Sequence, residues 1–577
     1  MKNGLLIGFQ IILSLLISIM LFSDNIVSFG LSFLLLSVAQ IFDRDKNFLS
    51  LKISWKQQTF LIFCSILFAI TFFPNNLFMV NYGIGLFVLL ILLIYGYLLV
   101  KKLYIFSEKK KSEGSKLPIS LYFFLFLAIS TLYLLAFDPG IFVADSINQW
   151  QQIHSDFPWN DWHPVMHTFF IKIFSFGSSS PIGFVFFQII VYSLVMSYMF
   201  NFIQDYLKVG MISIFLVFFL VFPVFPMMSI MIIKDSLFTY FLILVTINLL
   251  KVVLTKGKWL QSNLNSFFMF ISLLGFVFFR HNGWPVFLVF VILFMILFRM
   301  KGLRFFIISL LVIATYLVVT GPIYTRNNVI KSDPTESLGM FVQISAAVIK
   351  NGEPLSENQE KYYSQIMSIE NWKNLYNPRD VDKIKFKERF NKNVIKDDSK
   401  AFILNTVKLA LKNPIVALKA YFLQTEVLWH SNMKVENLRP IFRYPLLGKQ
   451  GPFYFLSKEQ IEKYSPQYES VMVKREKFHN PFLENMLVSF TQHIVDKKIF
   501  KLFMPALFFL MFIVGIGFLI TKKQFDLLLS FMPYLLTMGT MFVAIPAQDI
   551  RYAFPNYFIG VIAIALGINV QSKKEKE

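Results

Sequence analysis

Cysteine and charge are scarce in this sequence. Its 577 residues include one cysteine, Cys64, which lies inside an apolar run. A single thiol excludes a disulfide framework and a cysteine-based metal site. Charged residues make up 15% of the chain and hydrophobic residues 56%. This composition excludes a soluble multidomain enzyme and is typical of an all-α polytopic membrane protein.

Acidic residues are fewer than basic ones, which gives a formal net charge of +21. Such an excess can indicate nucleic-acid binding, but here much of it lies in short connections between apolar runs, where Lys and Arg set the topology. We therefore expect no nucleic-acid partner. The charge pattern predicts a multi-pass protein of the cell membrane with cytoplasmic N- and C-termini.

A small-residue cleavage pattern is missing after the first apolar run, so this run is interpreted as a helix and not as a signal peptide. Runs of about 16 to 22 apolar residues can cross the hydrocarbon core as helices. The sequence predicts 14 spans, near 5–22, 26–42, 58–73, 79–100, 118–137, 181–200, 209–228, 236–254, 264–279, 284–299, 304–320, 502–520, 526–545 and 553–570.

Two segments on the predicted outer side are too long to be simple connections. Residues 137–180 form a large external loop that contains a stretch suited to an interfacial helix, His163 to Phe176. Residues 321–501 mix basic and acidic side chains and are long enough to form a soluble external domain. The predicted organisation is a four-helix N-terminal unit, a transmembrane core with the external loop, the external domain, and three C-terminal helices with a basic cytoplasmic tail, at 1–110, 111–320, 321–501 and 502–577.

The short outer loops contain only three cations, Lys234, Arg280 and Arg551, and each stands beside a polar group. Asp235 follows Lys234, and Asn282 shares a tight turn with Arg280. Each cation alone can be interpreted as a snorkelling side chain at a helix end. Their coincidence at one membrane depth favours a common site.

Asp145 lies just beyond the predicted span that ends near Phe137. Ionisable groups at the membrane boundary cost desolvation energy, so a carboxylate there is a candidate site residue. The alternative is that Asp145 caps a short helix over residues 146–152.

His163 and His167 are four residues apart in the segment NDWHPVMH, together with Asp161. This spacing resembles half of a metal site. Pro164 follows His163 directly, however, and disfavours a helix that contains both imidazoles. We assign no metal ligands from the sequence and no certain cofactor, although a divalent metal stays open.

A carboxylate beside separated Lys and Arg residues suits a phosphate or pyrophosphate group whose lipid tail stays in the bilayer. Arg offers a planar fork to such a group and Lys a point charge. The carboxylate can then deprotonate an attacking hydroxyl.

At these residues the chain resembles the GT-C superfamily of integral membrane glycosyltransferases, particularly its protein-mannosyltransferase and aminoarabinose-transferase-like branch. It is also similar to an uncharacterised group of multi-pass proteins of Gram-positive bacteria. The resemblance covers roughly residues 118–570, and its motifs are Asp145 in the first large loop, His163-Pro164, Lys234-Asp235, the turn from Arg280 to Gly283, and Arg551 to Pro555.

The resemblance implies transfer of a sugar from a polyprenyl-phosphate donor to a hydroxyl of a cell-wall glycopolymer, lipid or protein on the outer face, by inversion. Asp145 would act as general base, and Lys234, Arg280 and Arg551 would hold the donor phosphate, with Asp235 and Asn282 in the same substrate site. Asp161, His163 or His167 would orient donor or acceptor.

The chain departs from this pattern in three ways. Ser146 follows Asp145 where an acidic pair is frequent, four spans precede the loop that usually follows the first, and the external domain lies between late spans. Three other functions stay open: a lipid-linked glycan flippase or other transporter, a glycan polymerase or ligase, and a non-catalytic scaffold. A transporter would place polar residues at mid-span, where this sequence has few.

Overall fold

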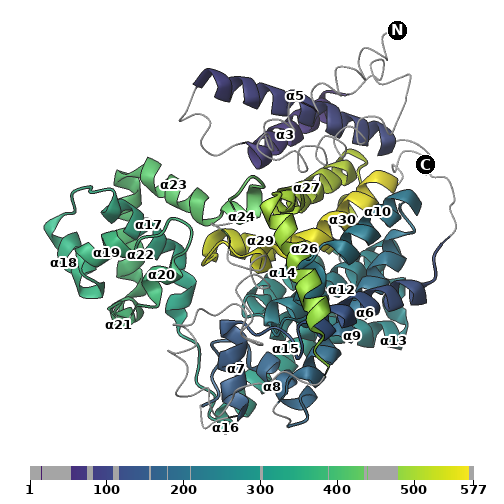
Figure 1. Cartoon of the computed structure of the whole chain (residues 1–577), viewed down its shortest axis with the longest axis horizontal. Helices are drawn as coiled ribbons and strands as arrows, with labels where there is room; N and C mark the ends of the chain where they lie inside the picture. Colours follow the sequence, from purple (N-terminus) through teal and green to yellow (C-terminus); the bar gives the residue numbers. More distant parts are fainter. Residues whose placement is uncertain are drawn as a thin grey trace.

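The computed structural model describes most of the chain, and every regular element in the described residues is a helix (Figure 1). The described residues are 15, 54–73, 82–107, 116–154, 158–177, 180–207, 209–298, 303–387, 389–434, 438 and 478–570. Three isolated β-bridges join loops within them. The predicted all-α class is thereby confirmed for this part of the protein.

Nine helical segments in the described part of the chain are long and apolar enough to cross a membrane. They are α3 (Trp55–Phe72), α5 (Tyr82–Ser107), α6 (Ile119–Ala136), α9 (Ile182–Ile203), α12 (Lys234–Leu254), α15 (Leu303–Val318) with its extension to Arg326, η8 (Ile499–Phe503) with α27 (Pro505–Thr521), α28 (Phe525–Leu528) with η9 (Leu529–Phe531) and α29 (Met532–Ala544), and η10 (Ile550–Ala553) with α30 (Pro555–Asn569). The chain is a helical membrane protein with several spans.

The predicted number of 14 spans is not reached by these helices. Spans 5–22 and 26–42 lie outside the described residues. The span predicted at 209–228 is a pair, α10 (Val209–Val221) and α11 (Val224–Ile230), bent by 54°. The spans predicted at 264–279 and 284–299 are α13 (Asn263–Phe278) and α14 (Gly283–Phe298), whose 16 residues each reach only about 24 Å. The count of 14 therefore stays a prediction.

Helices α12 and α30 form the centre of the bundle, with 83% and 94% of their apolar windows buried. Glycines bring α27 close to α30: a Cβ atom at Gly560 would lie 2.2 Å from the carbonyl oxygen of Phe508, and one at Gly567 would lie 2.5 Å from that of Gly515. Any larger side chain there would push the two helices apart. This contact holds α30 against α27, and η10, which directly precedes α30, carries Arg551.

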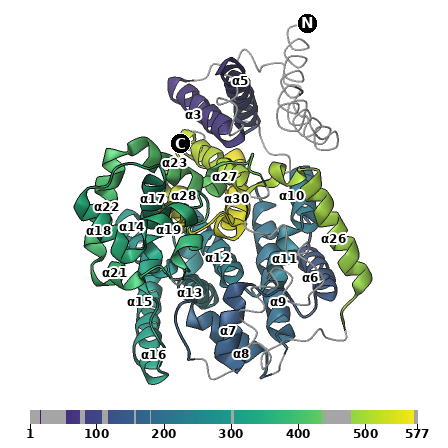
Figure 2. The same ribbon diagram turned by 60° about the vertical axis from the view of Figure 1, so that its left-hand side comes forward.

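The described part of the predicted N-terminal unit consists of α3 and α5. They share a hydrophobic cluster with α27 and α30 and lie at one side of the bundle in Figure 2. Gly517 of α27 contacts the ring of Phe60, so a side chain at that position would collide with α3. The unit is therefore packed against the C-terminal helices of the chain.

Residues 334–424 form a group of helices beside the bundle, which we call the inserted domain (Figure 1). Its elements are η4 (Pro334–Leu338), α17 (Gly339–Lys350), α18 (Glu357–Ile366), α19 (Ile369–Leu375), α20 (Asp382–Lys385), α21 (Lys392–Asp397), α22 (Ser399–Lys412) and α23 (Pro414–Gln424). They enclose a separate core around Trp372 and Tyr363. The short helix α24 (Glu426–Trp429) leads back to the bundle.

The inserted domain lies within the predicted external domain at 321–501, and residues 439–477 of that prediction lie outside the described residues. The preceding span does not end near residue 320, because η3 (Val319–Ile323), a π-helical turn that accommodates Pro322, continues it into α16 (Tyr324–Arg326). At the other end, α26 (Pro481–Asp496) lies along α6 (Figure 2). Both ends thus belong to the membrane bundle, and the solubility of the domain stays a prediction.

The first large loop contains two helices, α7 (Ala144–His154) and α8 (Val165–Phe174). They pack against each other, and α8 also packs against α9. The helix predicted in residues 163–176 is therefore present, and it starts directly after Pro164, as the proline predicts.

Candidate functional site

A short stretch of extended chain brings the starts of α7 and α12 together. Ile141 pairs with residues 230–232: its N–H donates to the carbonyl of Ile230 at 3.1 Å, and its carbonyl accepts from Ile232 at 2.9 Å. The two segments run in parallel, so the helices that follow them begin side by side. Residues 89 positions apart in the sequence thereby meet in space.

Ser146 stabilises the contact between the starts of α7 and α12. Its hydroxyl accepts from the N–H of Val143 at 2.9 Å and donates to the carbonyl of Ile232. Ser146 therefore fixes the first turn of α7. The alternative interpretation of Asp145 as the cap of a helix over residues 146–152 is wrong, because α7 begins at Ala144 and Asp145 lies within its first turn.

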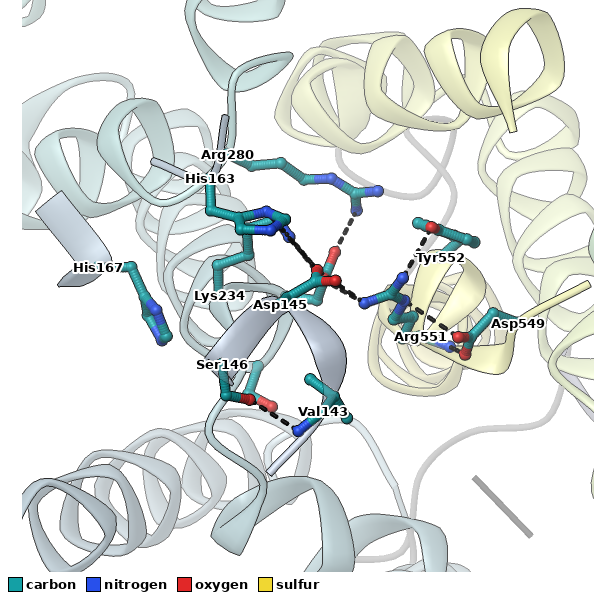
Figure 3. A network of polar contacts seen from close by, with 12 residues as sticks. Val143, Asp145, Ser146, His163, His167, Lys234, Arg280, Asp549, Arg551 and Tyr552 are labelled. Carbon is teal, nitrogen blue, oxygen red and sulfur yellow. Dashed lines mark hydrogen bonds and ion pairs between the residues drawn. The ribbon is translucent and has the colours of Figure 1, made fainter. Parts of the chain in front are cut away.

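Asp145 is the centre of the site (Figure 3). Its Oδ2 atom lies 2.5 Å from Nζ of Lys234 and 3.0 Å from Nη1 of Arg551. Nδ1 of His163 lies 3.8 Å from the same oxygen. The Asp145 side chain is 17% exposed, so it is shielded from water but can still be reached.

Asp235 forms a second, deeper carboxylate whose side chain is 1% exposed. Nη1 of Arg280 lies 3.2 Å from it, and Lys234 and Arg551 each lie 4.0 Å away. A buried carboxylate without partners would be strongly destabilising. Asp235 is thus compensated by the three cations that the sequence predicted for the substrate site.

Arg551 links both carboxylates to the start of α30. Its Nε lies 3.0 Å from Oδ2 of Asp549, and its Nη2 donates to the hydroxyl of Tyr552 at 2.9 Å. Asp549 also caps η10, because its Oδ1 accepts from the N–H of Arg551 at 3.1 Å. The guanidinium is therefore held on several sides while it contacts Asp145.

The turn that carries Arg280 is anchored to α29. Nη2 of Arg280 lies 3.2 Å from the sulfur of Met541, and the amide of Asn282 donates to the hydroxyl of Thr540 at 2.7 Å. A Cβ atom at Gly283 would lie 2.2 Å from the carbonyl oxygen of Phe276, which requires glycine at that position. Asn282 consequently supports the turn that carries Arg280.

His163 stands beside the ion pairs as a neutral imidazole. Its Nδ1 lies 3.1 Å from Nζ of Lys234, and because an ammonium can only donate, Nδ1 accepts. Burial and the positive charge of Lys234 lower the pKa of His163 to about 3. Trp162 stacks on the ring with centroids 5.7 Å apart. His163 thus orients Lys234 without adding charge.

The pKa of Asp145 reflects two opposing effects. Burial alone would raise it, but the positive charges of Lys234 and Arg551 outweigh burial and hold the pKa of Asp145 well below its ordinary value. The side chain is therefore a carboxylate at neutral pH. While both cations remain in contact, it is a weak base.

Two predicted site residues have contact partners other than Asp145. Nδ1 of His167 lies 2.8 Å from Oε1 of Gln149, and Figure 3 shows His167 pointing away from Asp145. Asp161 instead lies 4.0 Å from His281, and its pKa is raised by burial. The two histidines of the possible metal pair thus have separate partners.

No group of three or more His, Cys, Asp or Glu side chains that could hold a metal ion occurs in the described residues. Asp145 and Asp235 are surrounded by cations, and a divalent ion would have to displace Lys234 and Arg551.

Sequence reasoning did not assign roles to Asp549 and Tyr552, although both contact Arg551. The spacing of Asp549, two residues before Arg551 at the start of a helix, is a capping signal that could have identified it. No sequence signal indicated the role of Tyr552, because its contact depends on the orientation of the Arg551 guanidinium.

Comparison with known proteins gives one match. The sequence pattern of DUF6020, a family of unknown function, matches residues 175–577. No curated protein and no solved structure matches the chain. Lys234, Arg280 and Arg551 lie within the matched region, whereas Asp145 and His163 lie before it.

Proposed function

The chain belongs to the DUF6020 family, and we propose that it is a membrane glycosyltransferase that moves a sugar from a polyprenyl-phosphate donor to a hydroxyl acceptor. The reaction takes place on the outer face of the cell membrane. The acceptor is a cell-envelope glycopolymer, a lipid or a protein.

One observation carries this proposal: the carboxylate of Asp145 lies 2.5 Å from Lys234 and 3.0 Å from Arg551 at the ends of apolar helices. Three carboxylates and three cations meet in this cluster. The cations of such a cluster can bind a phosphate in place of one of the carboxylates, since Lys and Arg bind both groups. Neighbouring apolar helices would let the lipid tail remain in the bilayer.

The proposed chemistry follows from that exchange. When the donor phosphate binds, it draws Lys234 and Arg551 toward itself, and the basicity of Asp145 rises. Asp145 then accepts the proton of the acceptor hydroxyl, whose oxygen attacks the anomeric carbon. The bond from that carbon to the phosphate oxygen breaks, and polyprenyl phosphate leaves with the electron pair.

The three cations stabilise the charge that grows on the leaving phosphate. Attack from the side opposite the phosphate inverts the anomeric centre. Phosphate is a good leaving group, so the reaction needs no general acid on the donor side. The proposal requires no bound metal, and we expect turnover to persist in EDTA.

The proposal is tested with purified full-length protein and a set of undecaprenyl-phosphate sugars. We expect one donor to raise the melting temperature, because a ligand that binds the folded state stabilises it. Asp145→Asn is expected to keep donor binding and lose sugar transfer. Asp205→Asn, a matched change in an exposed ion pair with Lys116, is the control.

Two results would contradict the proposal. Full transfer activity in Asp145→Asn would show that Asp145 is not the general base. If no undecaprenyl-phosphate sugar raised the melting temperature, a polyprenyl-phosphate donor would be contradicted. A donor that crosses the membrane chemically unchanged would instead identify a flippase.

A further inference from the structure

Two buried glutamines join the inserted domain to the loop that precedes Arg551. The amide of Gln424, at the end of α23, donates to the carbonyls of Ile545 and Pro546 at 2.9 and 2.6 Å. The amide of Gln548 donates in return to the carbonyls of Leu423 and Gln424 at 2.8 and 2.6 Å. Both side chains are at most 1% exposed, and we call this pair the glutamine latch.

The latch has further support on the side of the inserted domain. Oε1 of Gln548 accepts from the N–H of Val427 at 2.7 Å. Arg379 lies 2.6 Å from Glu426, the first residue of α24, and the N–H of Val381 donates to the carbonyl of Pro546 at 3.1 Å. The loop at 545–548 is therefore bound to the inserted domain at several points.

On the other side, the latch leads directly to the site. Gln548 precedes Asp549, which caps η10 and pairs with Arg551. Arg551 in turn lies 3.0 Å from Asp145. Arg551, a cation of the site, therefore follows Gln548 of the latch by three positions in the sequence.

We propose that the inserted domain positions Arg551 through the glutamine latch, with Gln424 and Gln548 as positioning residues. The carbonyls of Ile545 and Pro546 follow the end of α29 at Ala544, and buried carbonyls need donors. Gln424 supplies such donors to the loop from the inserted domain, and Gln548 of the loop donates in return to the carbonyls of Leu423 and Gln424. Without the two glutamines the loop can relax, and a displacement of about 1 Å at Arg551 weakens its contact with Asp145 and with any bound anion.

The first test measures the loop itself, in full-length protein reconstituted in lipid nanodiscs without ligand. Gln548→Ala and Gln424→Ala are expected to speed amide hydrogen exchange in residues 547–554 by about tenfold, because local opening becomes easier. Gln343→Ala is the matched control, since Gln343 is also buried in the inserted domain but donates to Asn377 within it. Unchanged exchange in both latch variants would overturn the proposal.

The second test asks whether the latch acts through Arg551, and it rests on the proposed function. Undecaprenyl phosphate is the probe. Gln548→Ala is expected to lower its affinity about five- to tenfold, and Arg551→Ala about ten- to a hundredfold. In the Arg551→Ala background, Gln548→Ala should have no further effect, because residues that act through one group are not additive.

The outcomes separate the two proposals. A loss of affinity on Gln548→Ala that persists without Arg551 means general destabilisation and overturns the positioning role. If the wild-type protein does not bind the probe, the proposed function fails, and the exchange result alone decides the role of the latch.

Discussion

The two ends of the bundle carry the same kinds of charged residue in opposite surroundings. At one end, Asp145, Lys234 and Arg551 are 11–17% exposed and share partners. At the other end, Lys116 and Asp205 form an ion pair whose side chains are 64% and 48% exposed. An exposed pair contributes little to stability, whereas a buried network depends on every partner. Burial, and not residue type, therefore distinguishes the site from an ordinary helix end.

The largest expected effect comes from Asp145→Asn. Removal of the general base should lower the rate constant for sugar transfer about 10²- to 10⁴-fold while the donor still binds. Single-turnover kinetics with the donor identified by thermal shift would measure this. Asp205→Asn should leave the rate unchanged, and an equal loss in both variants would erase the difference between the two ends.

Arg551→Ala is expected to have the second largest effect, on stability. It leaves Asp145 and Asp549 with fewer partners, and breaking a buried ion pair costs about 3–5 kcal/mol of unfolding free energy. Arg304→Ala removes an exposed arginine near the opposite end, which donates to the carbonyl of Leu260, and should cost less than about 1 kcal/mol. Denaturant unfolding in detergent measures the unfolding free energy of both variants. Similar losses in Arg551→Ala and Arg304→Ala would contradict the proposed difference between the two ends of the bundle.

The protonation of His163 is expected to have a smaller effect, which makes the unfolding free energy depend on pH. Its pKa is about 3 in the folded protein and about 6.5 in an unfolded chain, so the unfolded state binds the proton first as the pH falls below 6.5. Stability is thus full above pH 6.5 and declines toward pH 3, by about 1–2 kcal/mol at pH 5.

The variant His163→Gln keeps an acceptor for Lys234 and should lose less stability than the wild type between pH 7 and pH 5. Melting temperatures at both pH values measure this difference, and His281→Gln is the control. Equal declines in the wild type and in His163→Gln would show that His163 titrates normally. The titration of Asp145 falls below this pH window and does not interfere.

The smallest effect is expected for Lys116→Ala. Its partner Asp205 is half exposed, so water replaces the lost contact and the unfolding free energy should change by less than about 0.5 kcal/mol. Thermal unfolding at low and high salt would detect a larger contribution. A loss above about 2 kcal/mol would show that this end of the bundle also depends on its charges.

Much of this architecture was predictable from apolar runs. Each of the twelve predicted spans between residues 58 and 570 coincides with a helix or a bent helix pair, because hydropathy reports where a backbone must satisfy its own hydrogen bonds. The end of α15 was not predictable in this way. Pro322 usually stops a helix, but here a π-turn accommodates it.

The sequence alone determined that this is a helical membrane protein and that Asp145, Lys234, Arg280 and Arg551 are its unusual boundary charges, because the cost of placing charge near hydrocarbon marks such residues wherever they occur. Only the tertiary structure decided which of them touch. The parallel pairing of residues 141 and 231 joins Asp145 to Lys234, and the glutamine latch holds the loop before Arg551. Hydropathy carries no information about such contacts, since they depend on distances between segments that are far apart in the sequence.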